Sequence, residues 1–312
     1  MYSSDLALMS NLFSKRNVEG LVKEFKRKYP NMHFFSRDVE DYPGMIEEMI
    51  DLNLKGWVLN SGDGGTHLFL SALYNRYEPS DERIPPLFVL PAGTINVHAS
   101  MVGHRGVLFS NPQDIMERII GLKYMENGEL DSVRKPLLCV DDGVETRVGC
   151  TVANGAVSKY FEEYINDPGF WNAVGQVGKR SSVFVLRELF RQRYEEYFPL
   201  RDMSFSLDER VVSDDFHGFA AYAMPFGIVG FHLPHTGEGV QVLATDFGGR
   251  RKFIRHFVEG VTGKGFTFEV NGSAENVVIG NAGKYVFDGE LWVPRDGANL
   301  EISVVEPLYG VL

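Results

Sequence analysis

Two hydrophobic patterns divide the chain into an N-terminal and a C-terminal part. In the N-terminal part, short apolar runs alternate with segments whose apolar residues recur every three or four positions. The runs are typical of buried parallel strands and the recurring positions of amphipathic helices. The order predicts a parallel sheet with helices on both faces. Expected strands cover residues 6–9, 32–36, 56–60 and 87–90, and expected helices cover residues 18–29 and 43–54.

Beyond residue 130 the pattern changes to short, often alternating segments separated by turn residues, which is typical of antiparallel strands. We therefore expect an α/β nucleotide-binding domain over residues 1–128 and a β-rich acceptor-substrate domain over residues 129–312, whose C-terminal tail could return to the first domain. Expected strands cover residues 134–140, 145–153, 204–207, 219–224, 239–244, 267–270, 276–279, 284–287 and 299–305.

A helical insertion is expected within the second domain, over residues 159–164 and 181–197, where aromatic and aliphatic residues recur at helical spacing. Such a pattern is typical of helices that pack on a sheet. For this segment, the family resemblance given below implies the alternative of an apolar cavity for an acyl chain.

The main candidate site is the turn that follows the strand at residues 56–60. Three glycines and one carboxylate lie between that strand and a helical segment, in the order Ser61, Gly62, Asp63, Gly64, Gly65 and Thr66. A strand, a glycine turn and a helix N-terminus together present free backbone N–H groups to an anion. Asp63 would repel a phosphate unless a divalent cation or a hydroxyl lay between them. A tight turn capped by Asp63 without any ligand is the alternative.

Two further loops follow expected strands. After residue 90 comes a loop with Gly93, Thr94 and Asn96, and after residue 9 comes a loop with Asn11 and Ser14. Successive parallel strands deliver their C-terminal loops to one edge of a sheet, so these loops suit a single nucleotide. For Asn11 and Ser14, a helix cap is an equally good interpretation.

These motifs resemble the diacylglycerol kinase catalytic-domain superfamily, which includes bacterial lipid kinases and sphingosine kinases and has the NAD kinases as distant relatives. Residues 61–64 match its Gly/Ser-Gly-Asp-Gly signature, and His67 falls where the family often has Asn or His. Residues 91–96 match its Pro-x-Gly-Thr-x-Asn loop, and residues 288–290 match its Asp-Gly-Glu. The first-strand loop of the family is Asn-Pro-x-Ser-Gly; Asn11 and Ser14 match it, whereas Leu12 and Lys15 do not.

The resemblance implies residue roles. Glu290 is the expected proton acceptor by similarity to bacterial lipid kinases, with Asp288 beside it, whereas similarity to sphingosine kinases favours Asp63. Without the other motifs, the Asp-Gly pair at residues 288–289 would predict a hairpin turn. Glu238 stands where some bacterial relatives bind a structural magnesium, with a solvated turn carboxylate as the alternative.

The sequence also departs from the family. Gly65 replaces a threonine whose hydroxyl would donate to phosphate, and Thr66 is a candidate substitute. Val157 stands where many relatives have an acid that contacts the acceptor. A catalytically inactive nucleotide-binding regulatory protein is therefore one alternative function.

Composition narrows the function classes. The net charge of −11 argues against nucleic-acid binding. No apolar run approaches the roughly 18 residues of a membrane span. The N-terminus lacks the apolar core of a signal peptide, and two cysteines, Cys139 and Cys150, form no disulfide framework, so a cytoplasmic protein is expected. The basic cluster Arg250, Arg251, Lys252 and Arg255 is expected to be a solvated helix face, with a contact to lipid phosphate as the alternative.

The leading hypothesis is an ATP-dependent, magnesium-dependent lipid kinase acting peripherally at a membrane on a diacylglycerol-like or sphingoid lipid. A kinase for a soluble alcohol is the runner-up enzyme.

Overall fold

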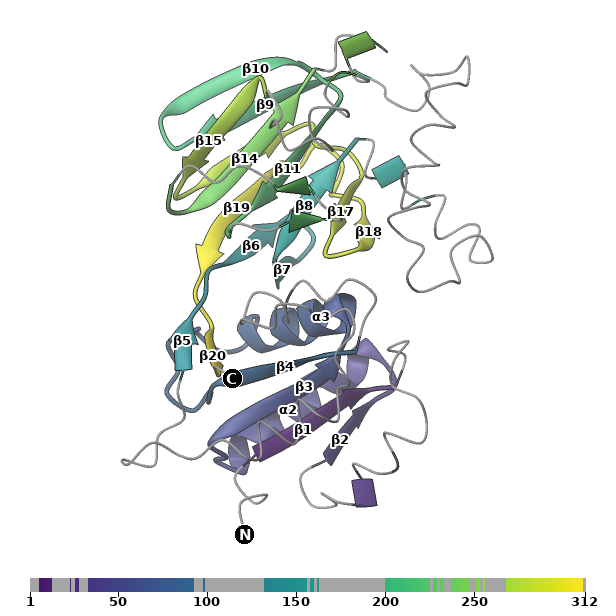
Figure 1. Ribbon diagram of the computed structural model, residues 1–312, viewed down its shortest axis with the longest axis vertical. Helices are drawn as coiled ribbons and strands as arrows, with labels where there is room; N and C mark the ends of the chain where they lie inside the picture. Colours follow the sequence, from purple (N-terminus) through teal and green to yellow (C-terminus); the bar gives the residue numbers. More distant parts are fainter. Residues whose placement is uncertain are drawn as a thin grey trace. The chain divides into compact units, whose positions relative to one another are not determined.

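The chain divides into two compact units (Figure 1). The first comprises residues 1–137, 147–149 and 305–312, and the second comprises residues 138–146 and 150–304. The computed structural model describes residues 6–12, 23, 26–27, 33–92, 98, 132–155, 158–159, 162, 200–224, 227–228, 231–232, 237–246, 251–252, 255 and 268–310. The predicted domain boundary at residue 128 lies outside these residues.

The first unit is built on a sheet with the strand order β2-β1-β3-β4-β20-β5 (Figure 1). Its strands are β1 (Leu6–Asn11), β2 (His33–Ser36), β3 (Gly56–Ser61), β4 (Leu87–Pro91), β5 (Ser132–Arg134) and β20 (Leu308–Gly310). Every neighbouring pair from β2 to β20 is parallel, whereas β5 runs antiparallel to β20. The sheet is therefore mixed, which corrects the expectation of a purely parallel one.

Helices pack beside this sheet because their apolar faces match its buried strands. They are the short η3 (Val39–Asp41), α2 (Tyr42–Asp51) and α3 (Asp63–Tyr74). All six residues of β3 are buried, as expected for a central strand. Phe69 of α3 packs edge-on against Tyr42 of α2 and Trp57 of β3, at ring-centroid distances of 5.7 and 6.2 Å. These aromatic contacts fix the middle of α3 relative to β3 and α2.

The second unit consists mainly of two antiparallel sheets. One has the order β15-β14-β11-β8-β17-β18, and in the other β10, β9, β16, β19 and β6 are successive neighbours. Residues from both sheets form one hydrophobic core, in which Phe205 packs edge-on against Phe216 and Phe219. The strands are β6 (Leu137–Asp141), β8 (Thr151–Asn154), β9 (Arg201–Leu207), β10 (Arg210–Phe216), β11 (Gly218–Tyr222), β14 (Val240–Thr245), β15 (Val270–Ala274), β16 (Val277–Gly280), β17 (Tyr285–Phe287), β18 (Glu290–Trp292) and β19 (Leu300–Val305).

Three short strands complete the list: β7 (Thr146–Gly149) and the paired β12 (Gly227–Ile228) and β13 (Phe231–His232). The prediction of an α/β part followed by an antiparallel β-rich part is thus confirmed in outline. Among the helices of the described ranges, none is long and apolar enough to cross a membrane.

Several predicted boundaries were wrong. The expected strand at 134–140 is two strands, β5 and β6, separated by Lys135 and Pro136, because proline cannot donate to a ladder. The expected strand at 145–153 is interrupted at Cys150, and the one at 267–270 begins only at Val270. β10 was not predicted, since its residues are polar and mostly exposed. Of the helix expected at 18–29, the structure describes only Lys23, Lys26 and Arg27, which are helical.

Candidate functional site

The glycine turn between β3 and α3 has the strand–turn–helix arrangement that the sequence predicts. β3 ends at Ser61, Gly62 is the residue before the helix, and α3 begins at Asp63. The first backbone hydrogen bond of the helix runs from Thr66 N to Gly62 O over 2.9 Å. The N–H groups of the first turn have no partner within the helix, and the helix dipole adds partial positive charge there. This turn can therefore bind an anion.

Two hydroxyls in this turn are buried without a hydrogen-bond partner among the described residues. They are Ser61 Oγ and Thr66 Oγ1, on residues that are 1% and 0% exposed. Buried hydroxyls in folded proteins are nearly always hydrogen-bonded, since an unmet one costs about 1–3 kcal/mol. Unsatisfied hydroxyls of this kind are expected where a bound ligand supplies the hydrogen-bond partner.

Side chains from two separate strands meet at Gly65. A Cβ atom on Gly65 would lie 2.2 Å from Ser61 Oγ and 2.3 Å from Asn11 Nδ2. Asn11 is the last residue of β1, and its amide also donates to Tyr42 Oη over 3.3 Å. Polar side chains from the C-terminal ends of β1 and β3 thus gather over the first turn of α3, where a glycine gives them room.

Asp63 is the first residue of α3 and is half-buried. Its Oδ1 accepts a hydrogen bond from the backbone N of His98 over 3.1 Å. A carboxylate in the first turn of a helix is stabilised by the helix dipole. Its oxygens are also the ligands that Mg²⁺ prefers.

A chain of polar side chains lies under the turn, across the three adjacent strands β3, β1 and β2. Asn60 Nδ2 donates to Ser10 Oγ over 3.0 Å, and Ser10 Oγ lies 2.8 Å from His33 Nε2. Burial, and next the nearby Lys26 charge, lower the pKa of His33 to about 4. His33 is therefore neutral at physiological pH, and no sequence pattern indicated its contact with Ser10.

Four predicted nucleotide-binding residues, Ser14, Gly93, Thr94 and Asn96, lie outside the described residues. Val157, which stands where many relatives have an acidic residue, also lies outside the described residues. The predicted metal ligand Glu238 is exposed, between Gly237 and a left-handed Gly239. Within the described part of the chain it belongs to no group of three residues that could hold a metal ion.

The Asp-Gly-Glu motif lies in the hairpin of β17 and β18, in which Phe287 pairs with Glu290. Asp288 and Gly289 form its turn with φ angles of +46° and +90°. The hairpin turn that the Asp-Gly pair predicts is therefore present. Glu290 is the first residue of β18 and is half-buried. The catalytic assignment of these residues stays a prediction.

The carboxylate of Asp288 anchors this hairpin to the start of β8. Its Oδ2 accepts from Cys150 N over 2.8 Å, and its Oδ1 accepts from Thr151 N and Oγ1 over 2.9 and 3.2 Å. In return, Asp288 N donates to Thr151 O over 3.1 Å. These contacts hold the backbone of the turn that precedes Glu290.

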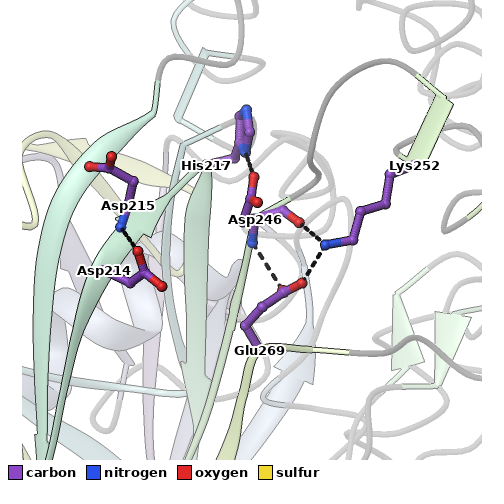
Figure 2. A network of polar contacts seen from close by, with 6 residues as sticks. All are labelled: Asp214, Asp215, His217, Asp246, Lys252 and Glu269. Carbon is purple, nitrogen blue, oxygen red and sulfur yellow. Dashed lines mark hydrogen bonds and ion pairs between the residues drawn. The ribbon is translucent and has the colours of Figure 1, made fainter.

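A second polar cluster in the second unit was not predicted. Figure 2 shows His217, Asp246, Lys252 and Glu269 turned toward one another. His217 Nδ1 lies 3.1 Å from Asp246 Oδ1, and Lys252 Nζ donates to Asp246 O and Glu269 Oε1 over 2.7 and 2.6 Å. Burial lowers the pKa of His217, while the Asp246 carboxylate opposes this shift. Lys252 therefore pairs within the protein, whereas its basic neighbours Arg251 and Arg255 are exposed.

Comparisons with known proteins identify the fold. No family model matches the sequence, and no curated protein matches it either. Three solved structures of diacylglycerol kinases from Bacillus anthracis str. Sterne, two of them called putative, are similar to the chain. They are 12%, 12% and 11% identical to it, with TM-scores of 0.68, 0.66 and 0.66. Each comparison covers 99% of this chain and 97% of the other. The chain thus has the same fold as these structures, which agrees with the resemblance that its motifs indicate.

Proposed function

We propose that this protein is an ATP-dependent kinase that phosphorylates a hydroxyl of a diacylglycerol-like or sphingoid lipid. The observation that carries the proposal is the pair of buried hydroxyls, Ser61 and Thr66, at the start of α3. They lie at the junction between the end of β3 and the N-terminus of α3. In an open α/β sheet, such a junction is the usual place for a bound phosphate. The similar structures, named diacylglycerol kinases, supply the lipid as acceptor.

ATP phosphates fit the glycine turn. The first-turn N–H groups of α3, the Ser61 and Thr66 hydroxyls and the Asn11 amide are donors that suit phosphate oxygens. Gly64 carries no side chain, so a phosphate can approach its backbone closely. Ser14, Gly93, Thr94 and Asn96 remain predicted contributors to the same nucleotide site.

Asp63 is the residue of this turn that would hold Mg²⁺. A lone carboxylate would repel the phosphates of a nucleotide, and its hard oxygens suit this cation. When bound, magnesium offsets the phosphate charge during phosphoryl transfer. The hydrogen bond from His98 N fixes one oxygen of Asp63 and thereby limits the directions that the carboxylate can take.

Glu290 is proposed as the general base. In the reaction the lipid hydroxyl attacks the terminal phosphorus of ATP, the bond to the bridging oxygen breaks, and the hydroxyl proton passes to a carboxylate. Asp288 acts as a positioning residue, because its bonds to Cys150 and Thr151 hold the turn in front of Glu290. Should Asp63 accept the proton instead, Glu290 would not be essential.

The test is transfer of labelled phosphate from ATP with magnesium to diacylglycerol, sphingosine or glycerol. We expect transfer to a lipid, and a loss of about 10²–10⁴-fold in Glu290→Gln and in Asp63→Asn, since a positioned base contributes about that factor. Glu301→Gln is the matched control, because Glu301 is an exposed carboxylate on β19 of the same unit.

Each other outcome selects an alternative. Transfer to glycerol alone would identify a kinase for soluble alcohols, and ATP binding without transfer would identify a regulatory nucleotide-binding protein. Normal turnover in Glu290→Gln together with loss in Asp63→Asn would move the base to Asp63.

A further inference from the structure

A small pocket lies in the second unit, apart from every residue assigned above. Its volume is about 150 Å³, and its lining residues are Gly155, Ser158, Lys159, Glu162, Arg201 and Lys284. Sites that enclose a whole drug-sized ligand occupy roughly 300–1,000 Å³. The pocket therefore suits a single small group, and the rest of a larger ligand would lie outside it.

The lining of this pocket is strongly basic in an acidic protein. Three of its side chains are cationic and only Glu162 is anionic, whereas the whole chain has a net charge of −11. Glu162 accepts from Lys159 Nζ over 2.7 Å and from Lys284 Nζ over 2.9 Å. The bond from Lys159 is the main reason why the pKa of Glu162 is lowered, with burial opposing it. Glu162 is thus ionised at neutral pH and offsets one of three positive charges.

Arg201 is the one cation of this pocket that Glu162 does not contact in the ion pairs of the described residues. At the start of β9, its guanidinium lies on Gly283, where a Cβ atom would be 1.8 Å from Arg201 Nη1. Gly283 also has a left-handed φ of +62°, so a side chain there would be both strained and blocked. Within the described part of the chain, no ion pair or hydrogen bond involves the Arg201 side chain. A partly buried guanidinium without a partner favours an anion, and its planar fork matches phosphate oxygens.

The pocket wall is held in place by backbone contacts. Ser158 Oγ donates to Lys284 O over 3.1 Å, and Lys159 N donates to Gly155 O over 3.1 Å. The start of the segment after β8 is thereby tied to the residue before β17. The cationic groups thus come from three separate parts of the chain and converge on one fixed pocket.

From this arrangement we infer that the pocket binds a phosphate group. Two net positive charges, three donor-rich side chains and room for one small group are the features that a phosphate requires. The group is either free inorganic phosphate or the phosphate of an anionic lipid headgroup. The inference does not rest on the proposed kinase activity, since it involves no nucleotide and no catalytic residue.

The experiment measures binding by the full chain without ATP. Inorganic phosphate is titrated by calorimetry at low ionic strength, and vesicles of phosphatidylglycerol are compared with vesicles of phosphatidylcholine by co-sedimentation. Arg201→Gln is expected to weaken binding at least tenfold, because it removes the guanidinium that would bind the phosphate oxygens. Glu162→Gln is expected to tighten binding several-fold, because it releases two ammonium groups. Arg210→Gln is the matched control, since Arg210 is an exposed arginine on β10 of the same unit.

The phosphate titration and the vesicle experiment together show whether the bound phosphate group is free inorganic phosphate or part of a lipid headgroup. Saturable binding of inorganic phosphate alone identifies free phosphate, and binding of phosphatidylglycerol vesicles but not phosphatidylcholine vesicles identifies a lipid headgroup. Binding by neither arm overturns the inference, as does equal binding by the native chain and the Glu162→Gln variant. This last comparison holds even if Arg201→Gln fails to fold. Kinase assays play no part, so failure here leaves the proposed function untouched.

Discussion

The hydroxyl of Ser61 occupies the space that a side chain at Gly65 would need. An ideal Cβ on Gly65 would stand 2.2 Å from Ser61 Oγ, well inside van der Waals contact. The two residues are therefore coupled, because a side chain at position 65 would have to displace the Ser61 hydroxyl.

This coupling predicts the behaviour of Gly65→Ala. The added methyl group must displace the Ser61 hydroxyl and the Asn11 amide, so we expect ATP affinity to fall about tenfold, the loss of roughly one phosphate contact. Calorimetric titration of ATP with magnesium measures this. Ser61→Gly alone should lower the ATP affinity by a similar factor, since it removes the hydroxyl that Gly65→Ala displaces.

The control for this series is Gly44→Ala. Gly44 lies in the exposed part of α2, and nothing stands within 4 Å of its Cβ position. Alanine there should raise stability by about 0.5–1 kcal/mol, since glycine is a poor helix former, and should leave ATP affinity unchanged. Equal ATP affinity in Gly65→Ala and the native chain would contradict the coupling.

Asp288 is predicted to contribute mainly to stability. Its carboxylate accepts three hydrogen bonds from residues 150 and 151, and its left-handed backbone is unfavourable for alanine. We expect Asp288→Ala to lower the free energy of unfolding by about 3 kcal/mol, because buried N–H groups lose a charged acceptor. Urea unfolding measures this.

Asp208→Ala provides the comparison. Asp208 also has a left-handed backbone in a hairpin turn, and its carboxylate accepts from Glu275 N and Asn276 N, but it is exposed. Asp208→Ala should therefore lower the free energy of unfolding clearly less than Asp288→Ala does. If the two variants lost equal stability, the backbone strain rather than the buried anchor would explain the effect.

The difference between these aspartates shows what the sequence could predict. Apolar runs identified β1, β3 and β4, and glycines placed the turn before α3, because these signals are local. The partners of Asp288 lie 137 and 138 residues away, so no local pattern indicates its anchoring role. The same holds for Asn11 over Gly65 and for the cations that line the basic pocket, since sequence spacing carries no information on such contacts.

Stability of the first unit should depend on the protonation of His33. Burial, and next Lys26, depress the pKa of His33 from 6.5 to about 4 in the folded protein. The folded state therefore binds fewer protons than the unfolded state between these values, and stability is lost as the pH falls from about 6.5 to about 4. We expect a loss of about 2 kcal/mol, after allowance for the solvent that reaches this half-buried ring.

Urea unfolding of the native chain and of His33→Gln from pH 7 to pH 4 tests this. The variant should lose less stability over the interval than the native chain, since glutamine does not titrate. A native chain and a variant with parallel pH profiles would assign the acid sensitivity to other groups, such as His217 with its lowered pKa.

The last prediction concerns the buried carboxylate of Asp142, which is 0% exposed. Its Oδ2 accepts from Tyr285 Oη over 2.7 Å, and its Oδ1 accepts from Val144 N and Glu145 N over 2.9 and 3.1 Å. Tyr285→Phe removes one donor from a charge that cannot reach water. We expect the free energy of unfolding to fall by about 1.5–3 kcal/mol, the range for hydrogen bonds to charged groups.

Tyr74→Phe is the matched control, because it removes the same atom from a different environment. The Tyr74 hydroxyl is buried and has no hydrogen-bond partner among the described residues. Removing this hydroxyl eliminates a buried polar group without a hydrogen bond among the described residues. The Tyr74→Phe variant should therefore be as stable as the native chain or more stable. Urea unfolding of the two variants side by side isolates the Asp142 contact. Equal stability of Tyr285→Phe and Tyr74→Phe would show that Asp142 draws its stabilisation from its backbone donors alone.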